Sequence, residues 1–394
     1  MSGAVNGELL ERVRERLAAQ PGEHDPARLA AAIRAEAGRV LGDTDLLCAL
    51  RLLQTEMTGA GMLEPLLHDA QVSDVLVTAP DAVWTDRGNG LERVPIRFPD
   101  EAAVRRLAQR LALAAGRRLD DAQPWVDGRL PEYERAPGES FGVRLHAVLA
   151  PIAQGGTCIS LRVLRPTGHS LGDLRASGTL TGESERLLDA IVGSRLAFLV
   201  VGGTGTGKTT LLSAMLAQVD PAERIVCVED AAELAPPHPH VVHLVARVPN
   251  VEGAGAITVR DLVRQALRMR PDRIVVGEVR GGEVVDLLTA LNTGHDGGAG
   301  TVHANSPREV PARLEALAAL GGMSREGLHS QLAAAVQVVL SMRRRSDGKR
   351  VLQEIGLVVR DDAGLRIETA WCADFDAAPA RTSLSRLLRE RGAR

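Results

Sequence analysis

A glycine-rich stretch between a short apolar run and a helical run constrains the fold of this 394-residue chain more than any other feature. Residues 196–201 (Leu-Ala-Phe-Leu-Val-Val) have the length and residue types of a buried strand. Residues 211–216 (Leu-Leu-Ser-Ala-Met-Leu) are typical of a helix. The intervening Gly-x-x-x-x-Gly-Lys-Thr of residues 202–209 is the phosphate-binding loop pattern in its required strand–loop–helix context. The alternative, a glycine-rich turn that binds nothing, is disfavoured by the full match and both flanks.

The residue types in this loop suit a bound phosphate. Glycines allow backbone N–H groups to approach phosphate oxygens closely, and a helix that begins near Lys208 directs its free N–H groups at the same anion. Lys208 is expected to reach the terminal phosphates, and the Thr209 hydroxyl is expected to ligate Mg²⁺. The candidate nucleotide-binding residues are Gly202, Gly203, Thr204, Gly205, Thr206, Gly207, Lys208, Thr209 and Thr210. The loop indicates a nucleotide, but alone it names no function.

Composition excludes several other classes. The chain is 45% hydrophobic and 25% charged with a net charge of −3, so it has no global basic signal and nucleic acid is not an expected partner. Its four cysteines are far apart and form no Cys-x-x-Cys pair, which argues against a zinc ribbon or a disulfide framework. The N-terminus lacks the layout of a signal peptide, and no apolar run approaches the ~18–20 residues of a membrane span. We therefore expect a cytoplasmic protein whose membrane contact, at the inner face, is peripheral.

The pattern of apolar residues predicts several domains. Strands alternate with helices around the phosphate loop, which is typical of an α/β, RecA-like P-loop domain, and a smaller α+β domain precedes it. A helix is predicted from Pro26 to about Gly38, and residues 123–131 are expected to form a polar loop. The predicted divisions are a helical N-terminal module (1–61), an α+β domain (62–165), a linker (166–180), the P-loop ATPase domain (181–360) and a C-terminal tail (361–394).

Acidic residues follow two further predicted strands. Residues 224–228 lead into Glu229 and Asp230, at the end of a strand where open α/β sheets bind their ligands. Residues 273–280 resemble a Walker B strand with Gly277 where the Mg²⁺-linked aspartate usually sits, and Glu278 at the position of a general base. Glu229 or Asp230 could supply the missing charge to the metal. Which of Glu229 and Glu278 orients the attacking water is left open, and so are the structural alternatives of a solvated loop and a salt bridge from Glu278 to Arg280.

Two histidines and two arginines complete the candidate site. His295 and His303 lie in glycine-rich loops on either side of a short predicted strand, and no cysteine is near enough in sequence to suggest zinc. We interpret them as polar sensors of the γ-phosphate, against the alternative of ordinary loop histidines. Arg144 and Arg162, on the last strands before the predicted linker, are candidates to stabilise developing negative charge, either from this chain or from a neighbour. The alternative is that they are solvated strand residues.

In their order, these stretches resemble the type II/IV secretion ATPases, and within them the CpaF-like branch of tight-adherence (Flp) pilus systems. Residues 202–210 are similar to the Walker A box, 228–234 to the Asp box, 266–281 to the Walker B box with the family's own Gly-Glu, and 293–305 to the His box. The resemblance covers about residues 70–360, includes residues 116–120 and 126–131, and aligns Arg144 and Arg162 with the family's strand arginines. Departures occur at Ala79-Pro80 and Val163-Leu164.

The resemblance implies a homohexameric ring that binds ATP and Mg²⁺ between its N- and C-terminal domains. Hydrolysis in such a ring drives domain motions that an inner-membrane platform protein converts into pilus assembly or protein secretion. One alternative is a conjugation-type DNA-transfer ATPase, against which the acidic net charge weighs mildly. The other is a nucleotide-binding regulator with little turnover, for which Gly277 leaves room.

Overall fold

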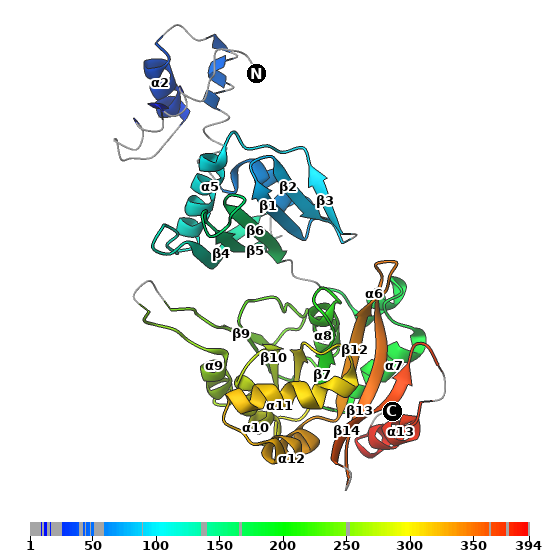
Figure 1. Ribbon diagram of the computed structural model, residues 1–394. Helices are drawn as coiled ribbons and strands as arrows, with labels where there is room; N and C mark the ends of the chain where they lie inside the picture. The colour runs from blue at the N-terminus through cyan, green and yellow to red at the C-terminus, as the bar shows by residue number, and fades with distance from the viewer. Residues whose placement is uncertain are drawn as a thin grey trace. The chain divides into compact units, whose positions relative to one another are not determined.

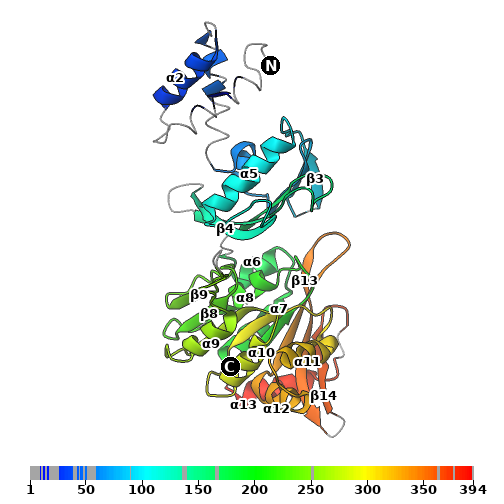
Figure 2. The same cartoon turned by 60° about the vertical axis from the view of Figure 1, so that its left-hand side comes forward.

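The computed structural model describes residues 26–38, 59–88, 90–134, 140–164, 168–249, 253–361, 364–375 and 378–392, with single positions between residues 9 and 50. The chain divides into two compact units, Met1–Leu164 and Arg165–Arg394, drawn from two directions in Figures 1 and 2. The helix predicted from Pro26 to about Gly38 is confirmed as α2 (Pro26–Glu36), whose Leu29 and Ile33 are buried in a small apolar cluster. The rest of the predicted helical module (1–61) lies largely outside the described residues.

The N-terminal unit contains a six-stranded antiparallel sheet in the order β3-β2-β1-β6-β5-β4. One helix, α5 (Glu101–Ala114), begins at an Asp100 cap that accepts the Ala103 N–H, and it buries Val104, Leu107 and Leu111 in the core of this unit. The remaining elements are a 3-10 helix (Gly61–Leu63), α4 (Glu64–His68), β1 (Asp74–Ala79), β2 (Ala82–Asp86), β3 (Leu91–Val94), β4 (Trp125–Glu134), β5 (Ser140–Val148) and β6 (Cys158–Leu164).

One prediction in this unit is wrong. Residues 123–131 were expected to form a polar loop, but β4 spans most of them and pairs along its length with β5. Only Val126 and Leu130 of this strand are buried, because the strand is mostly exposed at the edge of the sheet. An edge strand with so few buried positions has little local apolar signal, so its hydrogen bonds to β5 are what define it.

The C-terminal unit is built on an eight-stranded sheet in the order β14-β13-β12-β7-β11-β10-β8-β9. The strands from β12 to β9 are parallel, while β13 and β14 continue the sheet antiparallel. Two apolar cores, one on each face, bury opposite sides of the same strands, as expected of a doubly covered α/β sheet. None of the described helices is long and apolar enough to cross a membrane.

The elements of this unit are as follows: α6 (Leu171–Ala176), α7 (Gly182–Gly193), β7 (Phe198–Val201), α8 (Lys208–Leu216), β8 (Ile225–Glu229), β9 (Val241–Val245), α9 (Val259–Ala266), β10 (Arg273–Val279), α10 (Glu283–Leu291), β11 (Ala299–Val302), a 3-10 helix (Pro307–Glu309), α11 (Val310–Leu320), α12 (Arg325–Ala335), β12 (Val338–Arg344), β13 (Arg350–Asp361), β14 (Gly364–Cys372) and α13 (Arg381–Glu390).

The predicted linker and the predicted tail are both part of this unit, which corrects their assignment. Residues 166–180 contain α6, which starts with a capping box between Ser170 and Asp173 and buries Leu171 and Leu174 in the core. Residues 361–394 contain all of β14, which pairs with β13, and α13, whose Leu384 is buried in the same core. A strand at Leu365–Thr369 and a charged terminal helix can be predicted in the tail from the sequence, and β14 and α13 confirm them, but the sequence does not show that they pack against this core.

Candidate nucleotide-binding site

The loop between β7 and α8 has the backbone conformation that its glycines allow. Gly202, Gly205 and Gly207 have φ angles of 149°, 72° and 92°, in the region that side chains disfavour. A Cβ atom on Gly202 would also collide with the carbonyl oxygen of Met342 on β12. Gly207 is the residue at which α8 begins, and the Thr206 hydroxyl donates to the Gly203 carbonyl at 2.9 Å. The loop therefore takes one defined shape at the end of β7.

Lys208 lies buried under this loop. Its Nζ donates to the carbonyl oxygens of Gly202 and Gly203, at 3.0 and 2.9 Å. Burial lowers the pKa of Lys208, and the negative charge of Glu278 opposes that effect. An ammonium group has three donors, so one remains for a phosphate oxygen at the loop. Thr209 and Thr210 are half-buried on the first turn of α8, as the phosphate-loop prediction requires.

Glu229 and Gly277 lie side by side at the ends of β8 and β10. Glu229 is 2% exposed, and its Oε1 accepts the N–H groups of Glu233 and Leu234 at 3.0 and 2.9 Å. A Cβ atom on Gly277 would lie 2.7 Å from the Glu229 Cγ. The glycine in the Walker B strand thus makes room for a carboxylate that comes from the neighbouring strand, which is the physical reason why an aspartate is missing there.

Glu278 lies in a cluster of charged groups at the carboxyl ends of the same parallel strands. Its Oε1 is 2.5 Å from Nε2 of His303, and its Oε2 pairs with Arg280, which also lies 3.2 Å from Asp230. Burial lowers the pKa of His303 and the charge of Lys208 acts in the same direction, so the neutral imidazole is favoured at neutral pH. The structure therefore brings Glu278, His303 and Lys208 together, and it also contains the salt bridge from Glu278 to Arg280.

His295 lies at the opposite, amino-terminal ends of the parallel strands. It precedes β11, which runs parallel to β7, and the Gly298 carbonyl accepts the N–H of Phe198 at the start of β7. Its Nδ1 is 3.1 Å from the Ala290 carbonyl oxygen at the end of α10. The phosphate loop follows the opposite end of β7, so His295 does not lie beside it. We expected both histidines to sense the γ-phosphate. For the loop of this chain that expectation is wrong for His295, whereas His303 lies at the correct end of its strand.

The predicted arginines lie in the other unit, side by side on its sheet. Arg144 on β5 pairs directly opposite Arg162 on β6, and Arg129 on β4 lies opposite Arg144. Arg144 forms two hydrogen bonds with Asp127, at 3.1 and 2.7 Å, and Arg162 forms one with Asp74 at 3.0 Å. Sequence reasoning missed Arg129, since its alignment with the other two depends on strand register. The role of these arginines in hydrolysis stays a prediction.

The carboxyl ends of the parallel strands carry oxygen donors of the kind that Mg²⁺ prefers. Among the described residues the buried Oε2 of Glu229 has no hydrogen-bond partner, and it lies 3.9 Å from Nδ1 of His243. A hydroxyl from Thr209, this carboxylate and phosphate oxygens are the hard ligands that Mg²⁺ prefers. Asp230, the other predicted metal ligand, is exposed and paired with Arg280. The described residues contain no group of three or more His, Cys, Asp or Glu that could bind a metal alone.

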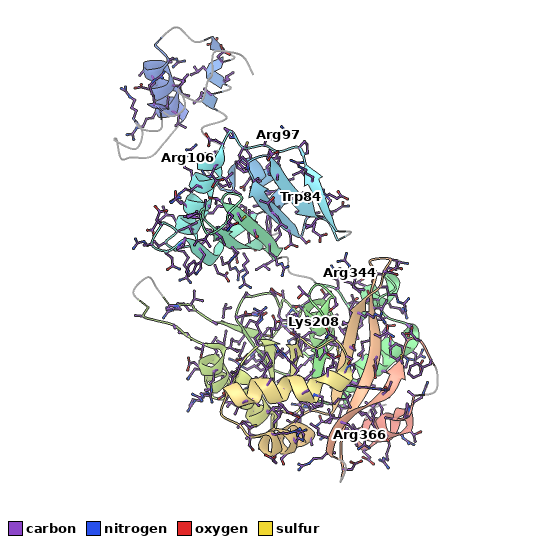
Figure 3. All side chains as sticks on the ribbon, viewed as in Figure 1. Trp84, Arg97, Arg106, Lys208, Arg344 and Arg366 are labelled. Atoms are coloured by element: carbon purple, nitrogen blue, oxygen red, sulfur yellow. The ribbon has the colours of Figure 1, made fainter. Side chains whose placement is uncertain are left out.

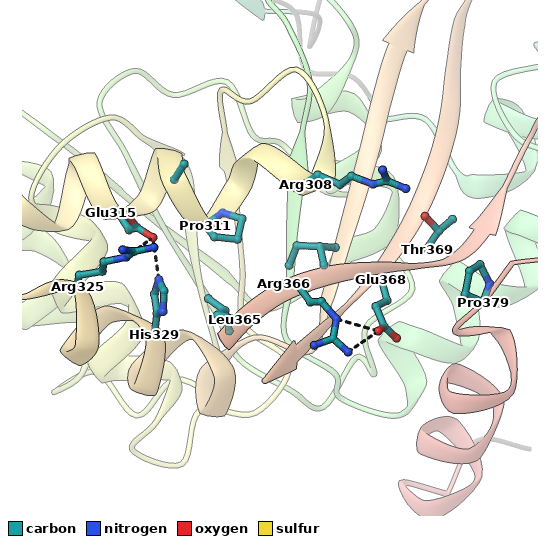
Figure 4. Close-up of a pocket in the computed structure, with 12 residues that line it drawn as sticks. Arg308, Pro311, Glu315, Arg325, His329, Leu365, Arg366, Glu368, Thr369 and Pro379 are labelled. Atoms are coloured by element: carbon teal, nitrogen blue, oxygen red, sulfur yellow. Dashed lines mark hydrogen bonds and ion pairs between the residues drawn. The ribbon is translucent and has the colours of Figure 1, made fainter. Parts of the chain in front are cut away.

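A pocket of about 590 Å³ lies elsewhere in this unit, between α11, α12 and β14 (Figure 4). Glu315 lies at its wall, bonded to His329 at 2.7 Å and paired with Arg325 at 3.2 Å, and these two neighbours lower the pKa of its carboxyl group. None of the predicted nucleotide-binding residues lines this pocket. It is therefore separate from the site at the phosphate loop.

Comparison with known proteins identifies relatives along most of the chain. The family model described as "Type II/IV secretion system protein" matches residues 56–352. A Mycobacterium tuberculosis protein named "Putative conjugal transfer protein Rv3659c" is 65% identical over 352 residues, which cover 89% of this chain and 99% of that protein. "Conjugal transfer protein TrbB" of Rhizobium radiobacter is 31% identical, over 73% of this chain and 84% of that protein.

A solved structure supports the fold. The pilus retraction motor PilT with bound ADP is similar to this chain with a TM-score of 0.52 and 21% identity, over 84% of this chain and 87% of that chain. At this level of identity the similarity concerns the fold, which agrees with the predicted α/β P-loop architecture.

Proposed function

The chain belongs to the type II/IV secretion system protein family and is an ATPase of that family, and from this premise we propose that it powers type IV secretion of the conjugal-transfer kind. The observation that carries the proposal is the 65% identity to a protein named for conjugal transfer, over 99% of that protein's length. The acidic net charge, which weighed against this interpretation, argues only against direct DNA binding, because a motor can act on a transfer apparatus without touching DNA.

In the proposed reaction the loop N–H groups and Lys208 bind the terminal phosphates of ATP. Thr209 and Glu229 hold Mg²⁺, which neutralises charge on the phosphates when it is bound. Glu278 orients the attacking water and accepts its proton, since its carboxylate lies at the loop and is anchored from one side by Arg280. The neutral His303 contacts the other oxygen of Glu278, so it can sense whether that carboxylate faces a γ-phosphate.

The proposal extends to assembly and partners. A homohexamer at the cytoplasmic face of the inner membrane, acting on a membrane platform protein, is what the sequence resemblance supports. Arg144 and Arg162 then provide the guanidinium groups that stabilise the transferred phosphoryl group, from this chain or a neighbouring copy. Their present partners, Asp127 and Asp74, hold both side chains on one face of the sheet.

Pilus assembly is the second candidate function. It is favoured by the four ordered sequence boxes and the Gly-Glu at 277–278, which resemble the tight-adherence branch. A nucleotide-binding regulator with little turnover stays an alternative, for which Gly277 leaves room, and a turnover measurement on the purified protein separates it from a motor.

The two candidates can be separated in cells that lack this gene. Complementation with the wild-type gene should restore DNA transfer between cells, whereas Lys208→Ala and Glu278→Gln should not, because one variant loses phosphate binding and the other loses turnover. Surface pilin is measured in the same strains. Loss of surface pilin with normal DNA transfer would contradict the conjugal-transfer proposal and support pilus assembly.

A further inference from the structure

The hairpin that joins β12 to β13 is strongly basic and rises beside the phosphate loop. Residues 343–350 include Arg343, Arg344, Arg345, Lys349 and Arg350, with Asp347 as the single acidic residue. β12 runs parallel to β7 with Ser341 opposite Val201, so its last residues continue past the point where the phosphate loop begins. Figure 3 labels Arg344 on this hairpin and Lys208 at the start of α8.

Strand register decides which of these side chains face the loop. Met342 pairs with Leu352, and both are buried in the core that also contains Leu211 and Leu212 of α8. Arg344 and Arg350 form the pair two residues further along, so they share that face. A Cβ atom on Gly207 would lie 3.4 Å from the Arg350 Cδ, so the stem of Arg350 covers the last glycine of the loop.

Arg344 and Arg350 place two positive charges on this face. Arg344 and Arg350 lie directly opposite one another, and like charges in that position destabilise a strand pair. Arg344 donates to the Gly348 carbonyl at 3.3 Å. The side chain of Arg350 is exposed and forms no hydrogen bond or ion pair in the part of the chain that the structure describes. An anion at the loop would give this guanidinium a partner.

We infer that Arg350, with Arg344 beside it, contacts the phosphates of the nucleotide bound in the loop of its own unit. The inference rests on the nucleotide binding proposed above. A guanidinium is always charged and offers several donors in a plane, which suits a second contact to phosphate oxygens beside Lys208. Arg350 therefore differs from Arg144 and Arg162, because its position against Gly207 is set within the C-terminal unit.

The test compares full-length wild type with Arg350→Gln, using Arg343→Gln as the matched control. Arg343 is exposed on the same hairpin but pairs with Val351, so it lies on the opposite face. Affinities for ADP and for inorganic pyrophosphate are measured by calorimetry, and melting temperatures without ligand are recorded. Arg350→Gln should weaken both ligands about tenfold, the value expected for one hydrogen bond to a charged group, and Arg343→Gln should change neither by more than about twofold.

The ligand-free melting temperature separates a binding role from a structural one. Arg350→Gln should melt at the wild-type temperature, because the exposed Arg350 side chain has no partner among the described residues to lose. Unchanged affinities, weaker ADP with unchanged pyrophosphate, or a lower ligand-free melting temperature that accounts for the loss would each overturn the inference. If wild type itself binds neither ligand, while Lys208→Ala behaves identically, the proposed nucleotide binding fails first.

Discussion

At the residue scale, the position of one carboxylate depends on the absence of another side chain. Glu229 points from β8 into the space beside Gly277 on β10, where its Oε1 bonds to two backbone N–H groups. The sequence identified both residues as unusual but could not connect them, since their contact depends on the pairing of β8 with β10. A glycine in a Walker B strand therefore predicts a close contact with a glutamate when that glutamate ends the adjacent strand.

A substitution at this position tests the contact. Gly277→Ala should lower the free energy of unfolding by about 1–3 kcal/mol, because the new methyl group overlaps the side chain of Glu229 and the packing must shift. Urea unfolding measures the change. Gly193→Ala is the control, since a Cβ atom there meets nothing within 4 Å in the same unit. Equal stability of Gly277→Ala and wild type would show that Glu229 is free to move aside.

The other site residues divide by the kind of signal that identifies them. The phosphate loop and His303 follow directly after apolar strands, and Glu278 lies near the end of one, so the sequence places all three at the carboxyl ends of the parallel strands. The sequence prediction misplaced His295, because this residue precedes β11 and therefore lies at the amino end of the strand, away from the phosphate loop. Arg129 and Arg350 gave no local signal, because their positions follow from register across three strands in one unit and across a hairpin in the other.

At the element scale, the long and strongly periodic segments are predictable, and the short ones are not. The α5, α7 and β7–α8 segments carry caps, periods or motifs that identify them. The linker and tail assignments fail because α6, β14 and α13 pack into the core of the C-terminal unit, which their own residues do not reveal.

The packing of α13 can be tested by truncating one buried side chain. Leu384→Ala should lower the free energy of unfolding by about 2–4 kcal/mol, because Leu384 is 1% exposed in the core of the C-terminal unit. Leu320→Ala on α11 should change it by less than about 0.5 kcal/mol, because Leu320 is 74% exposed. Denaturant unfolding followed by circular dichroism compares the two variants. Similar small effects for both would mean that α13 is a dispensable tail.

At the scale of the whole molecule, the chain joins a unit with the phosphate loop to a second unit that carries aligned arginines. The family and the α/β P-loop fold were predictable from four ordered motifs, because each one follows or precedes a strand of the same sheet. The branch within the family was not predictable in the same way. The shared motifs serve ATP hydrolysis, whereas the transported cargo is chosen by surfaces that these motifs do not describe.

ATP hydrolysis with Glu278 as the base is tested most directly by Mg²⁺-dependent ATP turnover of the purified full-length protein, compared with Glu278→Gln. Wild type should hydrolyse ATP, and Glu278→Gln should bind ADP with unchanged affinity while its turnover falls by about 10²–10⁴-fold, because the carboxylate that accepts the proton is lost. Native mass measured with and without ATP should show a hexamer-sized particle under the conditions of turnover. Turnover by Glu278→Gln equal to that of wild type would contradict the assignment of the base and, with it, the mechanism proposed for this site.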